Sequence, residues 1–226
     1  MRLPNTAAQA HVTGREIAMR PDCERIASKE WVMAHLKFDI AKLEKLNDPA
    51  RFETLPPLVF WNALGKPSGA CAIVEIGAGT GLFASAFSSF APDAVIYAVD
   101  TSPEMLDWMR ANRPEVAEGR IVPVEAEETR VPLDDGIGNA VYMINLHHEL
   151  AHPDASYAEA VRLLAPGGRL LVVDWADRDT PKGPPREVRV SAARLAKMLE
   201  GAGLAHVEVD EAALQWHVMA TAVRPG

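Results

Sequence analysis

The sequence predicts an α/β fold with a Rossmann-like, seven-stranded, mostly parallel sheet, one antiparallel strand and an N-terminal helical cap. Short apolar runs alternate with segments of helical pattern, which is typical of strand–helix–strand units. The apolar run at 71–76 leads directly into a glycine-rich turn and a helix. Two strand candidates follow one another at the end of the chain, which predicts a closing hairpin and hence the antiparallel strand.

The composition fits one domain with a modest extension. The chain has 226 residues, of which 48% are hydrophobic, so a sizeable core is available. The net charge of -8 argues against a nucleic-acid partner, which would need a basic face. No apolar stretch is long enough to cross a membrane, and the first residues lack the apolar core of a signal peptide. We therefore expect a cytoplasmic protein whose partners include neither nucleic acid nor a membrane.

Residues 1–69 are predicted to form an N-terminal arm and a helical cap. The first 22 residues are polar and show no helical period. An apolar stripe at helical spacing follows, formed by Val32, Leu36, Ile40 and Leu43. Pro56 and Pro57 then open a short helix that ends near residue 64.

Residues 70–226 are predicted to form the domain that contains the sheet. After 71–76, strands are expected at 94–99, 121–124, 140–145, 169–174, 204–209 and 214–223. Helices are expected between them at 83–90, 103–112, 156–164 and 191–200. Ser102 is a suitable cap for the second of these helices, and Pro103 takes its first position.

The turn after the first strand has the pattern E-x-G-x-G-x-G, from Glu75 to Gly81. Glycines permit a tight turn and let a ligand approach the backbone. A dinucleotide-binding turn needs a further glycine where Leu82 stands, which disfavours a nicotinamide cofactor. The pattern resembles the first motif of the class I S-adenosyl-L-methionine (SAM)-dependent methyltransferases, a family that shares the predicted seven-stranded layout.

The resemblance assigns cofactor-binding roles to residues at several strand ends. Glu75 would hold the methionine ammonium of SAM, directly or through water, and Asp100 would bind the ribose hydroxyls. Met105 would lie near the adenine, whose amino group would meet Glu127 or Glu128. The remaining residues assigned to the cofactor are Gly77, Ala78, Gly79, Thr80, Gly81, Thr101, Asn145 and Leu146. The alternatives are a helix N-terminal carboxylate for Asp100 and a solvated acidic loop for the two glutamates.

His147, His148 and Glu149 follow the fourth strand at the edge of the sheet where α/β proteins bind ligands. A histidine titrates near neutrality and can accept a proton from an attacking oxygen or nitrogen. These three residues are therefore the catalytic candidates. The alternative is structural, since many methyltransferases need only to place the nucleophile in line with the methyl group.

The same stretch matches the zinc-protease pattern H-E-x-x-H between His148 and His152. That pattern binds zinc only on a regular helix, where residues four apart share a face. Pro153 biases His152 away from helical geometry, so we predict that methyl transfer requires no metal.

Two further segments are similar to a type 11 subgroup of small methyltransferases, of the ubiquinone-biosynthesis and arsenite-methyltransferase type. They are Val-Asp-Trp at 173–175 and Lys-Gly-Pro-Pro at 182–185. Arsenite enzymes use several cysteines, whereas this chain has only Cys23 and Cys71, and the second lies in a predicted buried strand. Arsenite is therefore disfavoured as the substrate.

The resemblance implies a methyltransferase that converts SAM to S-adenosyl-L-homocysteine (SAH) while methylating a small-molecule acceptor. The alternatives are a nicotinamide-dependent Rossmann oxidoreductase and a SAM-binding protein that transfers nothing. The acceptor and the oligomeric state stay open, and a homodimer is one option. An apolar stripe must be buried, so we also expect the helix with Val32 and Leu36 to act as a lid over the acceptor. Packing on the side of the domain or on another subunit is the alternative.

Overall fold

The computed structural model describes residues 40–226 of the chain. The chain divides into two units at 42/43, and the description below concerns the unit Leu43–Gly226. Val32 and Leu36 of the predicted lid helix lie outside the described residues. No helix within residues 40–226 is both long and apolar enough to span a membrane.

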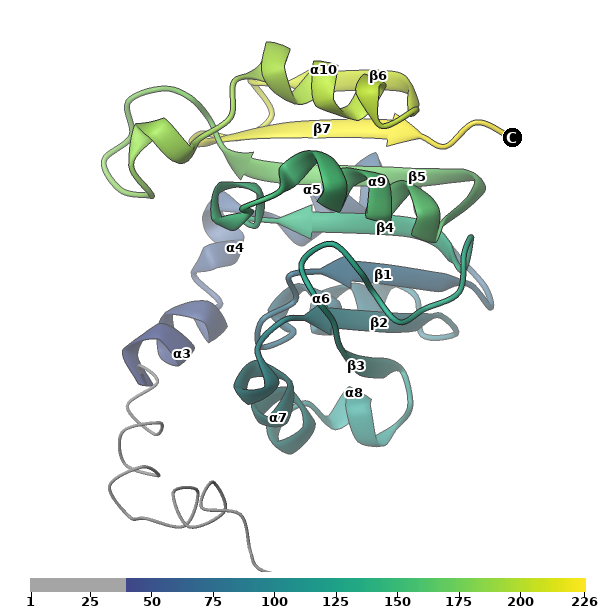
Figure 1. The fold of residues 1–226 in the computed structure, drawn as a ribbon. Coiled ribbons are helices and arrows are strands. Elements are labelled where there is room, and N and C mark those ends of the chain that lie inside the picture. The colour runs from purple at the N-terminus through teal and green to yellow at the C-terminus, as the bar shows by residue number, and fades with distance from the viewer. Residues whose placement is uncertain (1–39) are drawn as a thin grey trace, which may run out of the picture. The chain divides into compact units, whose positions relative to one another are not determined.

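A single seven-stranded sheet has the strand order β3-β2-β1-β4-β5-β7-β6 (Figure 1). β7 runs antiparallel to both of its neighbours, and the pairs among β1 to β5 are parallel. The predicted fold class is therefore confirmed. The strands are β1 (Ala72–Ile76), β2 (Val95–Asp100), β3 (Ile121–Glu125), β4 (Gly138–Ile144), β5 (Leu164–Trp175), β6 (Ala205–Asp210) and β7 (His217–Val223).

Two strands begin three or more residues away from their predicted starts. β5 begins at Leu164 instead of 169, because the expected turn is drawn into the sheet by hydrogen bonds between Arg224 and both Gly167 and Gly168. β7 begins at His217 instead of 214, because the Asp210 carboxylate accepts hydrogen bonds from two backbone amides of the preceding turn.

Prolines start several of the helices, since a proline at the first helical position loses no intrahelical hydrogen bond. Pro114 starts a short helix that the sequence analysis missed, and Pro153 starts a helix three residues earlier than predicted. The α-helices are α3 (Ile40–Asn47), α4 (Arg51–Thr54), α5 (Pro57–Ala63), α6 (Leu82–Phe90), α7 (Pro103–Asn112), α8 (Pro114–Ala117), α9 (Pro153–Leu163) and α10 (Ala192–Gly201). Two 3-10 helices are η1 (His147–Glu149) and η2 (Arg186–Val188).

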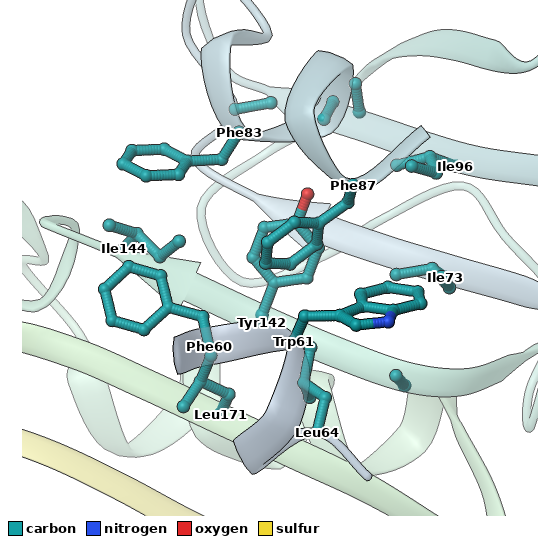
Figure 2. Close-up of a cluster of buried hydrophobic side chains, with 14 of the residues drawn as sticks. Phe60, Trp61, Leu64, Ile73, Phe83, Phe87, Ile96, Tyr142, Ile144 and Leu171 are labelled. Carbon is teal, nitrogen blue, oxygen red and sulfur yellow. The ribbon is translucent and has the colours of Figure 1, made fainter. Parts of the chain in front are cut away.

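Alternate residues of the central strands face two different hydrophobic layers, as the period of two in a strand requires. Ile73 belongs to the layer that contains side chains of α5, α6 and α7, whereas Val74 belongs to the layer with α9 and α10. Figure 2 shows the first layer, where the Tyr142 ring lies among aromatic side chains. The ring centroids of Phe87 and Tyr142 are 4.6 Å apart.

Helix α5 contributes to the same core as the sheet. Phe60 is fully buried, and the rings of Trp61 and Phe87 lie 5.4 Å apart in an edge-on contact. The structure divides the chain at 42/43, and the domain boundary at 69/70 stays a prediction. Residues 51–63 therefore pack against one face of the sheet.

Replacing Phe60 with Ala should destabilise the protein by about 3–5 kcal/mol, because a fully buried aromatic side chain leaves a cavity. Leu58 in the same helix is 57% exposed, so Leu58→Ala should change the free energy of unfolding by less than about 0.5 kcal/mol. Urea unfolding of both variants measures the difference. Equal effects of the two substitutions would contradict this account of α5.

Candidate active site

The turn between β1 and α6 depends on its glycines. Gly77, Gly79 and Gly81 have φ angles of 75°, 53° and 71°, a left-handed region that side chains other than glycine rarely adopt. A Cβ atom on Gly77 would lie 2.7 Å from Cδ1 of Leu146. The turn and Leu146, two predicted parts of the cofactor site, are therefore in direct contact.

Asp100 fastens this turn to the end of β2. One carboxylate oxygen accepts a hydrogen bond from the Gly79 amide at 2.6 Å, and the other accepts one from the Ser102 amide at 2.9 Å. Ser102 in turn caps α7 by accepting a hydrogen bond from the Met105 amide. The helix-terminal role and the ribose role are compatible, because a carboxylate has about four lone pairs and two are used here. Thr101 beside it is exposed.

Glu75 is almost fully buried, at 2% exposure. The Tyr142 hydroxyl donates a hydrogen bond to its carboxylate at 3.0 Å, and the Ala84 amide donates another. Burial raises the pKa of Glu75 to about 8, although these hydrogen bonds and the charge of Arg51 oppose the shift. A cationic ligand group placed nearby would favour the ionised form of this carboxyl.

Two arginines connect the end of α3 with the glycine turn and with α6, the helix that follows the turn. Arg113 donates to the carbonyl oxygen of Thr80 at 2.9 Å and to the side chain of Asn47 at 2.6 Å. Arg51 donates to the carbonyl oxygen of Leu46 at 2.9 Å, and its guanidinium lies over the Phe83 ring. The sequence analysis did not identify either arginine, because no local pattern marks a contact between residues so far apart in the chain.

The two acidic residues after β3 differ in their surroundings. Glu127 is exposed, and its backbone pairs with Arg130. The Glu128 carboxylate accepts a hydrogen bond from the His152 amide at 2.6 Å, which ties this loop to the start of α9. Glu127 is thus the more accessible of the two, and the adenine role stays a prediction for either residue.

The chain turns sharply after β4, where Asn145 has a left-handed φ of 56°. The Asn145 amide donates to the carbonyl of Val173 at the end of β5, and η1 follows. The side-chain oxygen of Asn145 is buried and has no hydrogen-bond partner in the part of the chain that the structure describes. After this turn, the side chains of His147 and His148 contact different residues.

His147 is buried against α9. Its Nδ1 atom lies 2.7 Å from the Tyr157 hydroxyl, and the two rings are stacked. Burial lowers the pKa of His147 below its ordinary value. The geometry of His147 therefore matches the structural alternative.

His148 instead contacts Asp174 at the end of β5, with its Nδ1 atom 2.9 Å and 3.2 Å from the two carboxylate oxygens. Asp174 is completely buried. Burial alone would lower the pKa of His148, but the hydrogen bond and the charge of Asp174 outweigh it and raise the pKa above its ordinary value. Glu149 is exposed, and its carboxylate lies 3.8 Å from Nε2 of His148. The sequence analysis noted Asp174 only as part of a family motif.

His148 and His152 do not share a helix. His148 lies in η1. His152 directly precedes Pro153 and has non-helical dihedral angles (φ -129°, ψ 63°), as expected for a residue before a proline. Among residues 40–226, no group of three or more His, Cys, Asp or Glu side chains is arranged to hold a metal ion.

The comparisons with known proteins agree with this geometry. The family model described as "Methyltransferase domain" matches residues 74–172. A demethylmenaquinone methyltransferase of Thermus thermophilus is 34% identical over 49% of this chain and 49% of its own length. A malonyl-[acyl-carrier protein] O-methyltransferase of Hahella chejuensis is 32% identical over 44% of this chain and 34% of its own. The chain thus spans half or less of these two relatives.

Solved structures extend the similarity to most of the chain. A SAM-dependent methyltransferase from Aquifex aeolicus has a TM-score of 0.74 and 27% sequence identity, over 83% of this chain and 99% of its own. A Haemonchus contortus phosphoethanolamine N-methyltransferase in complex with SAM has a TM-score of 0.65 at 14% identity, covering 75% of this chain and 52% of its own, and so supports the fold alone.

The sheet order and the glycine turn define a class I methyltransferase fold. Within that class, residues 74–172, from β1 into β5, match the family model of the methyltransferase domain. The resemblance inferred from the motif at 75–81 is therefore confirmed, and SAM is the cofactor of this family.

Replacing Asp100 with Ala should weaken SAH binding by about 1–3 kcal/mol, because the amides of Gly79 and Ser102 would lose their acceptor, as would the ribose in its predicted position. Asp107→Ala is a matched control, since Asp107 is exposed and pairs with Arg110 on α7. Calorimetry with SAH and with NAD tests the prediction. Tight NAD binding with no SAH signal would reject it.

Proposed function

We propose that this protein transfers the methyl group of SAM to a small-molecule acceptor that loses a proton in the reaction. The observation that supports this proposal is the His148–Asp174 pair, which lies at the same edge of the sheet as the glycine turn. The names of the relatives, a demethylmenaquinone and a malonyl-[acyl-carrier protein] methyltransferase, support an organic acceptor. A cytoplasmic location is part of the proposal and agrees with the acidic composition.

The residues at this edge fit SAM. The glycine turn presents backbone where a Cβ atom would fill the space, as at Gly77. The carboxylates of Asp100 and Glu75 suit the ribose and the methionine ammonium, and Met105 and Glu127 are assigned to the adenine. When bound, SAM supplies an electrophilic methyl group on a sulfonium.

His148 is the catalytic base of this proposal. Because the Nδ1–H of His148 donates to Asp174, the lone pair of the neutral ring is on Nε2. That atom takes the proton from the acceptor as the bond to the methyl group forms. Asp174 is a positioning residue, which holds the ring and raises its basicity. His147 is engaged with Tyr157 and serves the fold in this proposal.

The rate of SAH formation should rise with pH as His148 loses its proton, with a midpoint above the ordinary histidine value of about 6.5. Asp174→Asn should move this midpoint to lower pH, because it removes the charge that raises the pKa, and should also lower the rate. The assay uses an acceptor found by screening hydroxylated small molecules. A slower Asp174→Asn variant with an unmoved midpoint would indicate a structural role only.

His148→Ala should lower the rate by about 10²–10⁴-fold, the usual contribution of a general base, and should leave SAH binding intact. His152→Ala is the matched control, because His152 is exposed and lies outside the pair with Asp174. Full activity of His148→Ala would exclude the base but not methyl transfer itself.

The lid remains part of the proposal, and contacts of residues 46–51 support it. A Cβ atom on Gly79 would lie 4.0 Å from Cδ1 of Leu46, and the Asn47 side chain accepts a hydrogen bond from Arg113. Deleting residues 1–47 should leave a folded protein that binds SAH, because the sheet and α5 are retained, but should abolish turnover. Deleting residues 1–22 should change neither. Unchanged turnover after the longer deletion would contradict the lid, and an unfolded product would indicate a structural element.

A further inference from the structure

His217 is a buried histidine that the site described above does not use. It is the first residue of β7 and stands opposite Trp175 of β5, with the two ring centroids 4.4 Å apart. Its exposure is 1%, and neither ring nitrogen has a hydrogen-bond partner within residues 40–226. Buried polar side chains are nearly always hydrogen-bonded, so an orphaned imidazole needs a reason. A side chain that is kept free to bind a ligand would explain the missing partners.

The face on which His217 lies is the face of Glu75. In β5, Leu171 and Val173 point into the layer that contains α5 and α6, and Trp175 follows two residues later. Because His217 is in register with Trp175, it points the same way. In β1, Ile73 belongs to that layer, and Glu75 follows it by two residues.

The strand order places His217 next to the predicted cofactor site, on the side away from β2. The glycine turn and Asp100 occupy the ends of β1 and β2, whereas β4, β5 and β7 follow in order on the other side (Figure 1). Neighbouring strands are about 4.8 Å apart, so the end of β5 is about 10 Å from that of β1. An acceptor that meets the methyl group of bound SAM must lie next to the cofactor at this edge. The end of β5 and the start of β7 fit that position.

The charges that act on His217 connect it with the proposed reaction. They belong to Asp174, Arg51, His148 and Lys182. Asp174 and His148 are the proposed catalytic pair, and Arg51 also acts on Glu75. His217 thus lies within electrostatic reach of both the methionine end of the cofactor site and the base.

The flat side chain beside His217 is covered by the loop after β5. A Cβ atom on Gly183 would lie 2.8 Å from the Trp175 ring, so the loop backbone packs directly on the indole. The guanidinium of Arg189 lies 5.6 Å from the same ring. The loop backbone and this guanidinium therefore hold the indole in place beside the imidazole.

We propose that His217 is a binding residue for the methyl acceptor, and that it binds an uncharged hydroxyl or carbonyl oxygen of that acceptor. This inference rests on the proposed methyl transfer. A neutral imidazole offers one donor and one acceptor, which suits such an oxygen. Burial lowers the pKa of His217 to about 4, although the charge of Asp174 opposes the shift, so the ring is neutral near pH 7. The nearby Asp174 and Arg51 already have partners in His148 and the Leu46 carbonyl.

The test is nuclear magnetic resonance of the full chain with ¹⁵N-labelled histidine, saturated with SAH. Three probes share one ring and differ in charge: phenol, benzoate and benzylammonium. Phenol should shift the ring nitrogens of His217 more than either charged probe does. The exposed His206 on β6 should not respond and serves as the internal control.

A variant separates binding from folding. His217→Phe keeps the size of the ring and should weaken phenol binding about tenfold, the effect of one lost hydrogen bond, while SAH binding stays unchanged. If this variant fails to fold, the resonances of the wild-type protein still decide the question. A stronger response to benzoate or benzylammonium, or His217 signals that no probe moves, would overturn the inference. Failure to bind SAH would instead reject the proposed function.

Discussion

The hydrogen bond from the Gly79 amide to the Asp100 carboxylate is the contact on which the cofactor side depends. The turn from β1 to α6 has three left-handed glycines and therefore little conformational restraint of its own. Asp100 holds it from the end of β2, and Arg113 holds it through the carbonyl of Thr80. A turn fixed before the ligand arrives loses less conformational entropy on binding.

The edge of the sheet beyond the turn shows how two adjacent histidines acquire different properties. Asn145 turns the backbone at the end of β4, after which His147 meets a phenol on α9 and His148 meets a carboxylate on β5. Burial among apolar groups keeps the first ring neutral, whereas a buried carboxylate favours the proton on the second. The difference in chemistry arises from their partners and not from their position in the chain.

Features that depend on neighbouring residues could be predicted from the sequence, and contacts between distant residues could not. The glycine turn and the Ser102 cap follow from local rules of backbone geometry. The pairing of His148 with Asp174 spans 26 residues, and that of Arg113 with Asn47 spans 66. Both pairings arise only when strands and helices pack together. The shift of β5 to Leu164 likewise requires Arg224, which lies near the end of the chain.

The position of β7 between β5 and β6 has a consequence for how the molecule is assembled. The ribosome makes β7 after β5 and β6, yet β7 must insert between these two strands, so this edge of β5 is unpaired until β7 has been made. Strands β1 to β4, with the glycine turn and Asp100, can pair before then. A chain that stops before residue 217 would therefore expose a long apolar edge strand, which is the kind of surface that drives aggregation.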